Sequence, residues 1–212
     1  MGDFEGFPAD GPEFYAALEE NNTREWWLEH KGDYESLIRE PMAALLDELS
    51  EEFGAAKMFR PQRDIRFSKD KSPYKTSQGG FAASAEGIGH YLHLDAAGLM
   101  VGGGFHAHTP DQVTRLRDAV DAPVSGVELA GIIDELTSAG FRIEGEKLLR
   151  VPRGYPVDHP RAELLKHKSL TAGKMFGVPA WFSTAEALQN VRAEWRRLTP
   201  LVDWLNGHLS GD

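Results

Sequence analysis

The sequence predicts an α+β protein with a central, mainly antiparallel sheet flanked by N-terminal and C-terminal helices. Apolar residues recur at helical spacing towards both ends of the chain, whereas short apolar runs joined by tight turns fill the middle. The predicted strands follow one another directly, which favours an antiparallel sheet over alternating βαβ units. We therefore expect residues 1–212 to form a single α+β domain.

The first third of the chain is predicted to be helical. A first helix is expected to run through about Asn21, because Pro12 suits the first turn of a helix. A second helix is expected to begin at Asn22, whose side chain can cap the first turn, with Glu25 completing a capping box. A third run of helical period covers residues 42–53.

The middle of the chain changes to a strand-like period. Short strands are expected at residues 81–85, 90–95 and 99–105, separated by glycine-containing turns. A further hairpin is expected to pair residues 141–143 with residues 147–151, because the turn-like tripeptide EGE joins them.

The last part of the chain contains three predicted helices. Thr109, followed by proline and Gln112, predicts a capped helix start, and Ser125 begins another helix. The final helix is predicted from a cap at residues 183–186 and an apolar stripe one face wide. The stripe repeats at steps of three and four residues: Leu188, Val191, Trp195, Leu198, Val202 and Leu205.

The composition excludes several classes of protein. The chain has no cysteine, which rules out disulfides, thiolate metal sites and thiol nucleophiles, and fits the reducing cytoplasm where we expect the protein. No apolar stretch approaches the roughly 18 residues of a membrane helix. The acidic N-terminus does not resemble a signal peptide, so no membrane is predicted as a partner.

The charge is distributed unevenly. The chain carries −10, which disfavours nucleic-acid binding by the whole surface. Seven basic and two acidic residues between Lys57 and Lys75 give that segment +5, so the remainder carries −15. This local reversal of sign is more informative than the total.

The most distinctive segment is FRPQRDIRFSKDKSPYKT, from Phe59 to Thr76. Arginine binds phosphate or carboxylate through two parallel hydrogen bonds, and lysine adds a mobile charge, so the segment predicts an anion site. If residues 63–67 form a strand, Asp64 and Arg66 share a face and can pair. A solvated edge or pairing with acidic helices is the alternative. The predicted anion-binding residues here are Arg60, Arg63, Arg66, Lys69, Lys71 and Lys75.

A second segment, residues 150–160, is proline-rich and poorly suited to regular structure. Its Arg150 and Arg153 would add to the anion site. Asp158 and His159 could form an acid/base pair, because histidine titrates near neutral pH. We favour the alternative in which Asp158 caps the helix that follows.

Histidines and glycines offer weaker signals. The run Gly102-Gly103-Gly104 matches neither nucleotide-binding signature and predicts a bulge or a close backbone approach. We predict no cofactor and no metal site, because no ordered signature such as HExxH accompanies the histidines. Surface or packed roles are therefore expected for His90, His93, His106 and His108.

Several segments occur together in a distinctive order. They are FEGFP from Phe4, NNTREWW ending at Trp27, the segment from Phe59 to Thr76, the glycine run, and LLRVPRGYPVDHP from Leu148 to Pro160. With these segments the chain resembles the family called domain of unknown function 2461. The resemblance covers nearly the whole chain and implies a single domain. It implies no activity.

Three functions remain open from the sequence. The first is a cationic site for a phosphorylated or carboxylated small molecule, in which Tyr74, Asp158 or His159 would move any proton. No nucleophile is evident, so whether the protein is an enzyme stays open. The second is a protein-interaction module whose basic loop meets an acidic partner. The third is a nucleic-acid-binding module with Phe67 and Tyr74 as stacking groups, which the acidic remainder disfavours. The sequence does not give the oligomeric state.

Overall fold

The computed structural model describes residues 4–64, 66, 70–107 and 109–210. The chain divides into two compact units, and each is assembled from segments that lie far apart in the sequence. Unit 1 comprises residues 1–82, 91–101 and 175–193, and unit 2 comprises residues 83–90, 102–174 and 194–212. That residues 1–212 form a single domain stays a prediction.

The described residues contain a six-stranded antiparallel sheet in the order β1-β2-β3-β4-β6-β5, which confirms the predicted α+β class. Its strands are β1 (Ala56–Met58), β2 (Ser77–Ala85), β3 (Ile88–Asp95), β4 (Gly98–Phe105), β5 (Arg142–Glu144) and β6 (Leu170–Gly177). The three predicted central strands are confirmed as β2, β3 and β4, each somewhat longer than expected. Tight two-residue turns join them, which fixes their antiparallel order.

The hairpin predicted after residue 141 is wrong. Strand β5 pairs with β6, with Ile143 opposite Ala172, rather than with residues 147–151. Gly145 has a φ of 127°, and a Cβ at this position would lie 2.1 Å from the carbonyl oxygen of Ser169. The chain therefore turns tightly against the residue that precedes β6, and β6 takes the place of the expected partner.

The helices of unit 1 follow the predicted pattern with one correction. They are α1 (Gly11–Glu20), α2 (Arg24–Glu29), α3 (Lys31–Tyr34), the π-helix η1 (Glu35–Arg39) and α4 (Glu40–Phe53). The second helix is capped by Thr23, whose Oγ1 accepts a hydrogen bond from the Trp26 amide at 3.2 Å. Asn22, the predicted cap, instead bonds to a distant loop.

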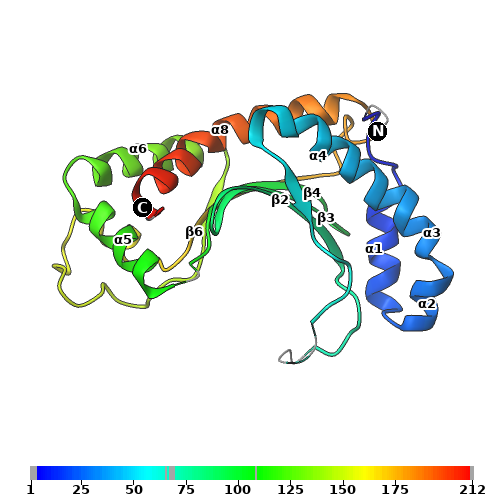
Figure 1. Ribbon diagram of the computed structural model, residues 1–212, viewed down its shortest axis with the longest axis horizontal. Helices are drawn as coiled ribbons and strands as arrows, with labels where there is room; N and C mark the ends of the chain where they lie inside the picture. Colours follow the sequence, from blue (N-terminus) through cyan, green and yellow to red (C-terminus); the bar gives the residue numbers. More distant parts are fainter. Residues whose placement is uncertain (1–3, 65, 67–69, 108, 211–212) are drawn as a thin grey trace. The chain divides into compact units, whose positions relative to one another are not determined.

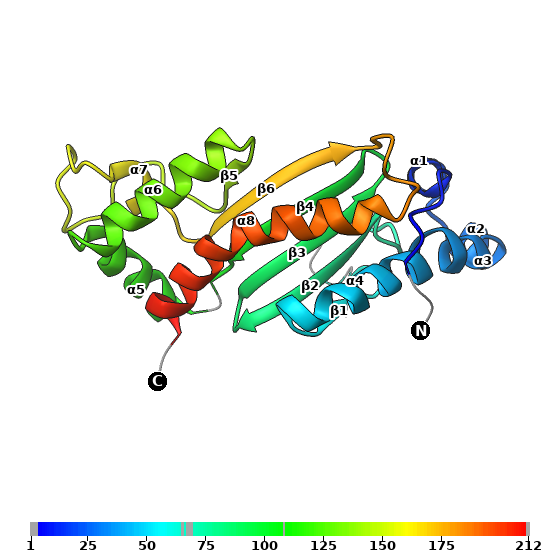
Figure 2. The same ribbon diagram turned by 90° about the horizontal axis from the view of Figure 1, so that it is seen from above.

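The helix α4 covers one face of the sheet in unit 1, above β1 and β2 (Figure 2). Leu46 of α4 lies so close to Gly80 that a Cβ there would be 2.5 Å from the Leu46 Cδ1. Because side chains alternate along a strand, Gly79 points to the opposite face. That opposite face carries the candidate site.

Unit 2 contains α5 (Pro110–Asp121), α6 (Ser125–Ser138), α7 (Ala162–Leu165) and the C-terminal part of α8 (Glu186–Leu209). The predicted capping box is present, because Thr109 and Gln112 exchange side-chain and backbone hydrogen bonds. Every member of the predicted stripe on α8 is buried, which confirms the final helix. None of the described helices is long and apolar enough to cross a membrane.

The glycines of β4 allow the close backbone approach that the sequence predicts. Gly104 has a φ of 139°, and a Cβ there would lie 2.3 Å from the carbonyl oxygen of Leu170. A Cβ on Gly103 would meet Leu198 of α8 at 3.4 Å. Both neighbours belong to unit 2, and the glycines let them pack directly against the strand.

Candidate functional site

Between β1 and β2 the described residues 59–64, 66 and 70–76, here called the cationic loop, form two limbs that pair with each other (Figure 1, cyan). The Arg63 amide donates to the Pro73 carbonyl at 2.9 Å, and the Lys75 amide donates to the Pro61 carbonyl at 2.8 Å. These bonds place Gln62 opposite Tyr74 in an isolated antiparallel bridge. The pairing brings basic residues from both ends of the loop together.

The strand considered at residues 63–67 is not present among the described residues of that range. Arg63, Asp64 and Arg66 lie outside the strands, while Ile65 and Phe67 lie outside the described residues. The local pairing replaces the strand because the proline-bounded limbs satisfy their hydrogen bonds with each other.

Tyr74 anchors the cationic loop to the helices of unit 1. Its ring is 8% exposed and stacks on Trp27, with centroids 4.2 Å apart and planes at 10°. Asn22 bonds to the Tyr74 backbone on both sides, since its Nδ2 donates to the carbonyl at 3.0 Å and its Oδ1 accepts from the amide at 3.1 Å. Tyr74 was predicted to transfer protons or to stack on bases, and in this position its ring packs on α2 instead.

Replacing Asn22 with alanine is expected to loosen the cationic loop. The change removes two hydrogen bonds that join residues 52 positions apart, which we expect to cost about 1–2 kcal/mol of unfolding free energy. Urea denaturation measures the global loss, and limited proteolysis within the loop measures local opening.

Asn21 provides the matched control for this substitution. Its Nδ2 bonds only locally, to the Ala17 carbonyl at 3.0 Å within an exposed helix end. Asn21→Ala should therefore leave loop proteolysis at the wild-type rate. Equal cleavage of the two variants would contradict the anchoring role of Asn22.

Two arginines of the cationic loop are paired with carboxylates inside the loop. The predicted pairing of Asp64 with Arg66 is confirmed: the Arg66 Nε donates to Oδ1 at 3.0 Å and its Nη2 to Oδ2 at 2.7 Å. These bonds lower the pKa of the Asp64 carboxyl. Arg63 Nη1 lies 2.6 Å from Asp70 Oδ2. Lys69, another predicted member, lies outside the described residues.

Lys75 is held in a cationic and partly apolar environment. Its ammonium lies 5.5 Å from the centroid of the Phe59 ring, which is 39% exposed. Burial, and then the charges of Arg60 and Arg63, lower the pKa of Lys75. The Arg63 Nε is buried and has no hydrogen-bond partner among the described residues. Lys75 therefore lies over an aromatic ring, and the charges of Arg60 and Arg63 act on it.

A second polar group lies on β3, where Tyr91, His93 and Asp95 occupy alternate positions and so share a face. The Tyr91 hydroxyl lies 2.9 Å from His93 Nδ1, and His93 Nε2 lies 2.9 Å from Asp95 Oδ2. The Ala97 amide donates to the other oxygen of Asp95 at 2.8 Å, which fixes the carboxylate. This hydroxyl–imidazole–carboxylate chain was missed because the histidines were considered only as metal ligands or as surface and packed side chains, and not together with Tyr91 and Asp95.

The cationic loop and this chain of side chains meet at Phe59. The rings of Phe59 and Tyr91 have centroids 6.2 Å apart. Gly79 leaves the space that the phenol occupies, because a Cβ there would be 2.7 Å from the Tyr91 oxygen. Burial, and then the negative charge of Asp95, raise the pKa of Tyr91. All of these residues belong to unit 1.

The second predicted segment, in unit 2, wraps the C-terminal end of α5. His159 Nε2 lies 3.1 Å from Asp121 Oδ1, so histidine pairs with this carboxylate rather than with Asp158. Arg161 donates through Nε to the Val120 carbonyl at 2.6 Å. Asp158 is exposed and does not cap α7, whose N-cap is Arg161, so the capping prediction is wrong.

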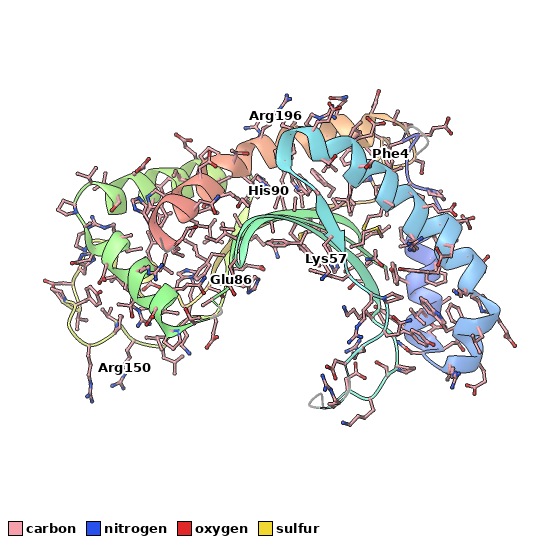
Figure 3. All side chains as sticks on the ribbon, viewed as in Figure 1. Phe4, Lys57, Glu86, His90, Arg150 and Arg196 are labelled. Carbon is pink, nitrogen blue, oxygen red and sulfur yellow. The ribbon has the colours of Figure 1, made fainter. Side chains whose placement is uncertain are left out.

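The two arginines predicted in this segment are exposed. Figure 3 shows Arg150 extending away from its loop, and Arg153 is also exposed. Both belong to unit 2, whereas the cationic loop belongs to unit 1. Their contribution to an anion site stays a prediction.

The remaining histidines show no arrangement typical of a metal centre. Among the described residues, no three His, Asp or Glu side chains are grouped so that they could hold a metal ion. His90 is buried beside α8, and its Nε2 donates to the Trp195 carbonyl at 3.2 Å (Figure 3). His106 is exposed, and His108 lies outside the described residues.

Unit 2 also has an open groove of about 410 Å³ between α6 and α8. Glu128 and Asp203 both line it, so its negative charge opposes the binding of an anion. Its lining is Glu128, Ile132, Pro200, Asp203, Trp204, Gly207 and His208, none of which is a predicted site residue.

The fold and site together define an α+β protein with a cationic loop beside a hydroxyl–imidazole–carboxylate chain. The chain belongs to the family described as conserved hypothetical protein (DUF2461), whose profile matches residues 11–204. This confirms the resemblance drawn from the sequence, and the match includes the cationic loop. No curated protein and no solved structure matches the chain. The function is therefore argued from the residues.

Proposed function

We propose that the cationic loop binds a small phosphorylated or carboxylated ligand. The observation that carries this proposal is the pairing of the two limbs of the loop. In the bridge between Gln62 and Tyr74, the flanking residues Arg63 and Lys75 point away from the buried face of Tyr74. Two cations thus share one face of the loop, with the Lys75 ammonium over the ring of Phe59.

Electrostatics supports an anionic ligand. Burial is the main cause that lowers the pKa of Lys75, and the positive charges of Arg60 and Arg63 lower it further. Such a cluster is relieved when a phosphate or carboxylate accepts hydrogen bonds from it, and charge-assisted bonds of this kind are the strong ones. The exposed ring of Phe59 would receive an apolar part of the ligand.

The other predicted cations contribute less directly to the proposed binding. Arg66 is held by Asp64 through two hydrogen bonds and would contribute charge rather than direct contacts. The further members proposed from the sequence are Lys69, Lys71, Arg150 and Arg153. A chain without cysteine fits the reducing cytoplasm, where we expect the ligand to be found.

A small ligand fits better than a nucleic acid. Of the two predicted stacking groups, Tyr74 is packed on Trp27, and Phe67 lies outside the described residues. The charge of −15 outside the segment from Lys57 to Lys75 would also repel an extended polyanion.

Lys75→Met is expected to weaken the binding of a small anion by about tenfold or more, because a hydrogen bond to a charged group contributes about 1.5–3 kcal/mol. Methionine keeps the apolar stem over Phe59 and removes the charge. Inorganic pyrophosphate and citrate serve as probes, and calorimetric titration measures their dissociation constants.

Lys31→Met is the matched control, since it removes one exposed lysine from α3 in the same unit. It should leave both dissociation constants within about twofold of wild type, because exposed charges at a distance are screened by salt. Wild-type protein that binds neither probe, or equal effects of the two variants, would count against the proposed site. Arg153→Ala tests in the same assay whether unit 2 contributes.

A further inference from the structure

We propose that Tyr91, His93 and Asp95 form a proton relay that acts as a general base on the ligand held by the cationic loop. The inference rests on the proposed function, because that site would supply the ligand. It adds an activity, the removal of a proton bound to oxygen or carbon in a small carboxylate or phosphate ester. Tyr91 is the catalytic residue, and His93 and Asp95 act through it.

The geometry orders the protons along the relay. Asp95 accepts hydrogen bonds only, so the proton between it and the imidazole is carried by His93 Nε2 at 2.9 Å. The proposed relay uses the tautomer in which His93 Nδ1 carries no proton and accepts from the Tyr91 hydroxyl, which lies 2.9 Å away. The two contacts place one imidazole nitrogen on a phenol and the other on a carboxylate, the arrangement that a histidine base oriented by a third group requires.

The proton transfer balances without any further reactant. The Tyr91 oxygen takes a proton from the ligand as its own hydroxyl proton passes to His93 Nδ1. The imidazole becomes an imidazolium, which the carboxylate of Asp95 stabilises, and the ligand is left with one more negative charge. Lys75 lies over the Phe59 ring that neighbours Tyr91, so it would provide positive charge on that side of the new anion.

The surroundings of Tyr91 suit a ligand at its hydroxyl. Tyr91 is only partly buried, and its phenol packs against the backbone of Gly79, where a side chain would collide with it. Phe59 lies next to the ring of Tyr91 and also under the ammonium of Lys75. A ligand whose anionic group contacts Lys75 and whose body rests on Phe59 would therefore extend towards Tyr91.

Tyr155 offers an internal comparison within the same chain. Its hydroxyl donates to Asp118 Oδ1 at 3.3 Å, so it is a partly exposed phenol beside a carboxylate with no imidazole in that contact. Burial raises the pKa of both Tyr91 and Tyr155. A difference in reactivity between them therefore reports on the histidine and not on a lower phenol pKa.

Sulfonyl fluorides test the relay without knowledge of the substrate. In their reaction the phenol oxygen bonds to sulfur, fluoride leaves, and the phenol proton passes to the base. The probes are 4-(fluorosulfonyl)benzoate, which carries a carboxylate, and the uncharged phenylmethanesulfonyl fluoride. Peptide mass spectrometry of the full-length protein gives the labelling rate of each tyrosine.

We expect 4-(fluorosulfonyl)benzoate to label Tyr91 about tenfold or more faster than Tyr155, in line with the usual effect of a positioned base. His93→Gln should remove this advantage, and Asp95→Asn should reduce it. Asparagine can still accept the Ala97 amide, so the turn is kept while the negative charge is lost. An unchanged labelling rate at Tyr155 and an unchanged thermal unfolding transition show that each variant is folded.

The outcomes separate the relay from the anion site. Faster labelling of Tyr91 by both probes, lost in His93→Gln but with no advantage for the carboxylate probe, supports the relay and removes the proposed anion site. If the carboxylate probe labels Tyr91 faster than the uncharged probe, and Lys75→Met abolishes this difference, the result supports the anion site together with the relay. Labelling of Tyr91 no faster than Tyr155, or unchanged in folded His93→Gln, overturns the relay whatever the anion-binding result.

Discussion

Gly104→Ala is expected to lower the unfolding free energy by about 4 kcal/mol or more, because two separate penalties act at this position. The φ of 139° is one that L-residues rarely adopt. The new Cβ would also lie 2.3 Å from the Leu170 carbonyl oxygen and 2.7 Å from the Thr171 Cα. Both contacts are with backbone, which cannot move without disturbing the pairing of β4 with β6.

Gly154→Ala separates the backbone penalty from the crowding. Gly154 has a φ of 99°, but a Cβ there would meet nothing within 4 Å. This variant should cost only about 1–2 kcal/mol, the usual penalty for a left-handed conformation. Urea denaturation of both variants gives the difference. Similar losses would show that the strands separate freely to admit the methyl group.

Local signals predicted the parts of the fold that depend on local interactions. The capping box at Thr109 and the apolar stripe of α8 involve residues three or four positions apart, and both are confirmed. Strand β6 was missed because its sequence, LTAGKMFG, lacks a clear alternation and contains two glycines. Its neighbours β4 and β5 lie far away in the sequence, so the pairing depends on tertiary contacts.

The candidate site likewise has features that local signals predict and features that depend on tertiary contacts. The cationic loop is visible as a reversal of charge, and Asp64 pairs with Arg66 as expected, although without the strand on which that expectation rested. The role of Asn22 could not be predicted, because its partner Tyr74 is 52 positions away. The alternation Y-x-H-x-D on β3 was a usable signal. Only the side-chain conformations, and the space left by Gly79, turn that spacing into a connected chain.

Acidification is expected to destabilise the protein through His90. Burial is the main cause that lowers the pKa of His90 from 6.5 to about 4, although the hydrogen bond to the Trp195 carbonyl and the charge of Asp203 act in the opposite direction. Below pH 6.5 the unfolded chain takes up a proton that the folded protein excludes. The unfolding free energy should therefore fall by about 3 kcal/mol as the pH drops from 6.5 to 4, and this stability is fully present above pH 6.5.

His90→Gln isolates this contribution from that of other groups. Burial also lowers the pKa of His167, and protonated carboxylates destabilise the protein in the same range, so the wild-type pH profile alone is not specific. The glutamine amide can donate to the Trp195 carbonyl in place of Nε2, but it does not titrate. Unfolding free energies from urea denaturation between pH 7.5 and 4.5 should converge for the two proteins as the pH falls. Parallel profiles would mean that the folded protein accommodates the charged His90, which its burial beside Trp195 argues against.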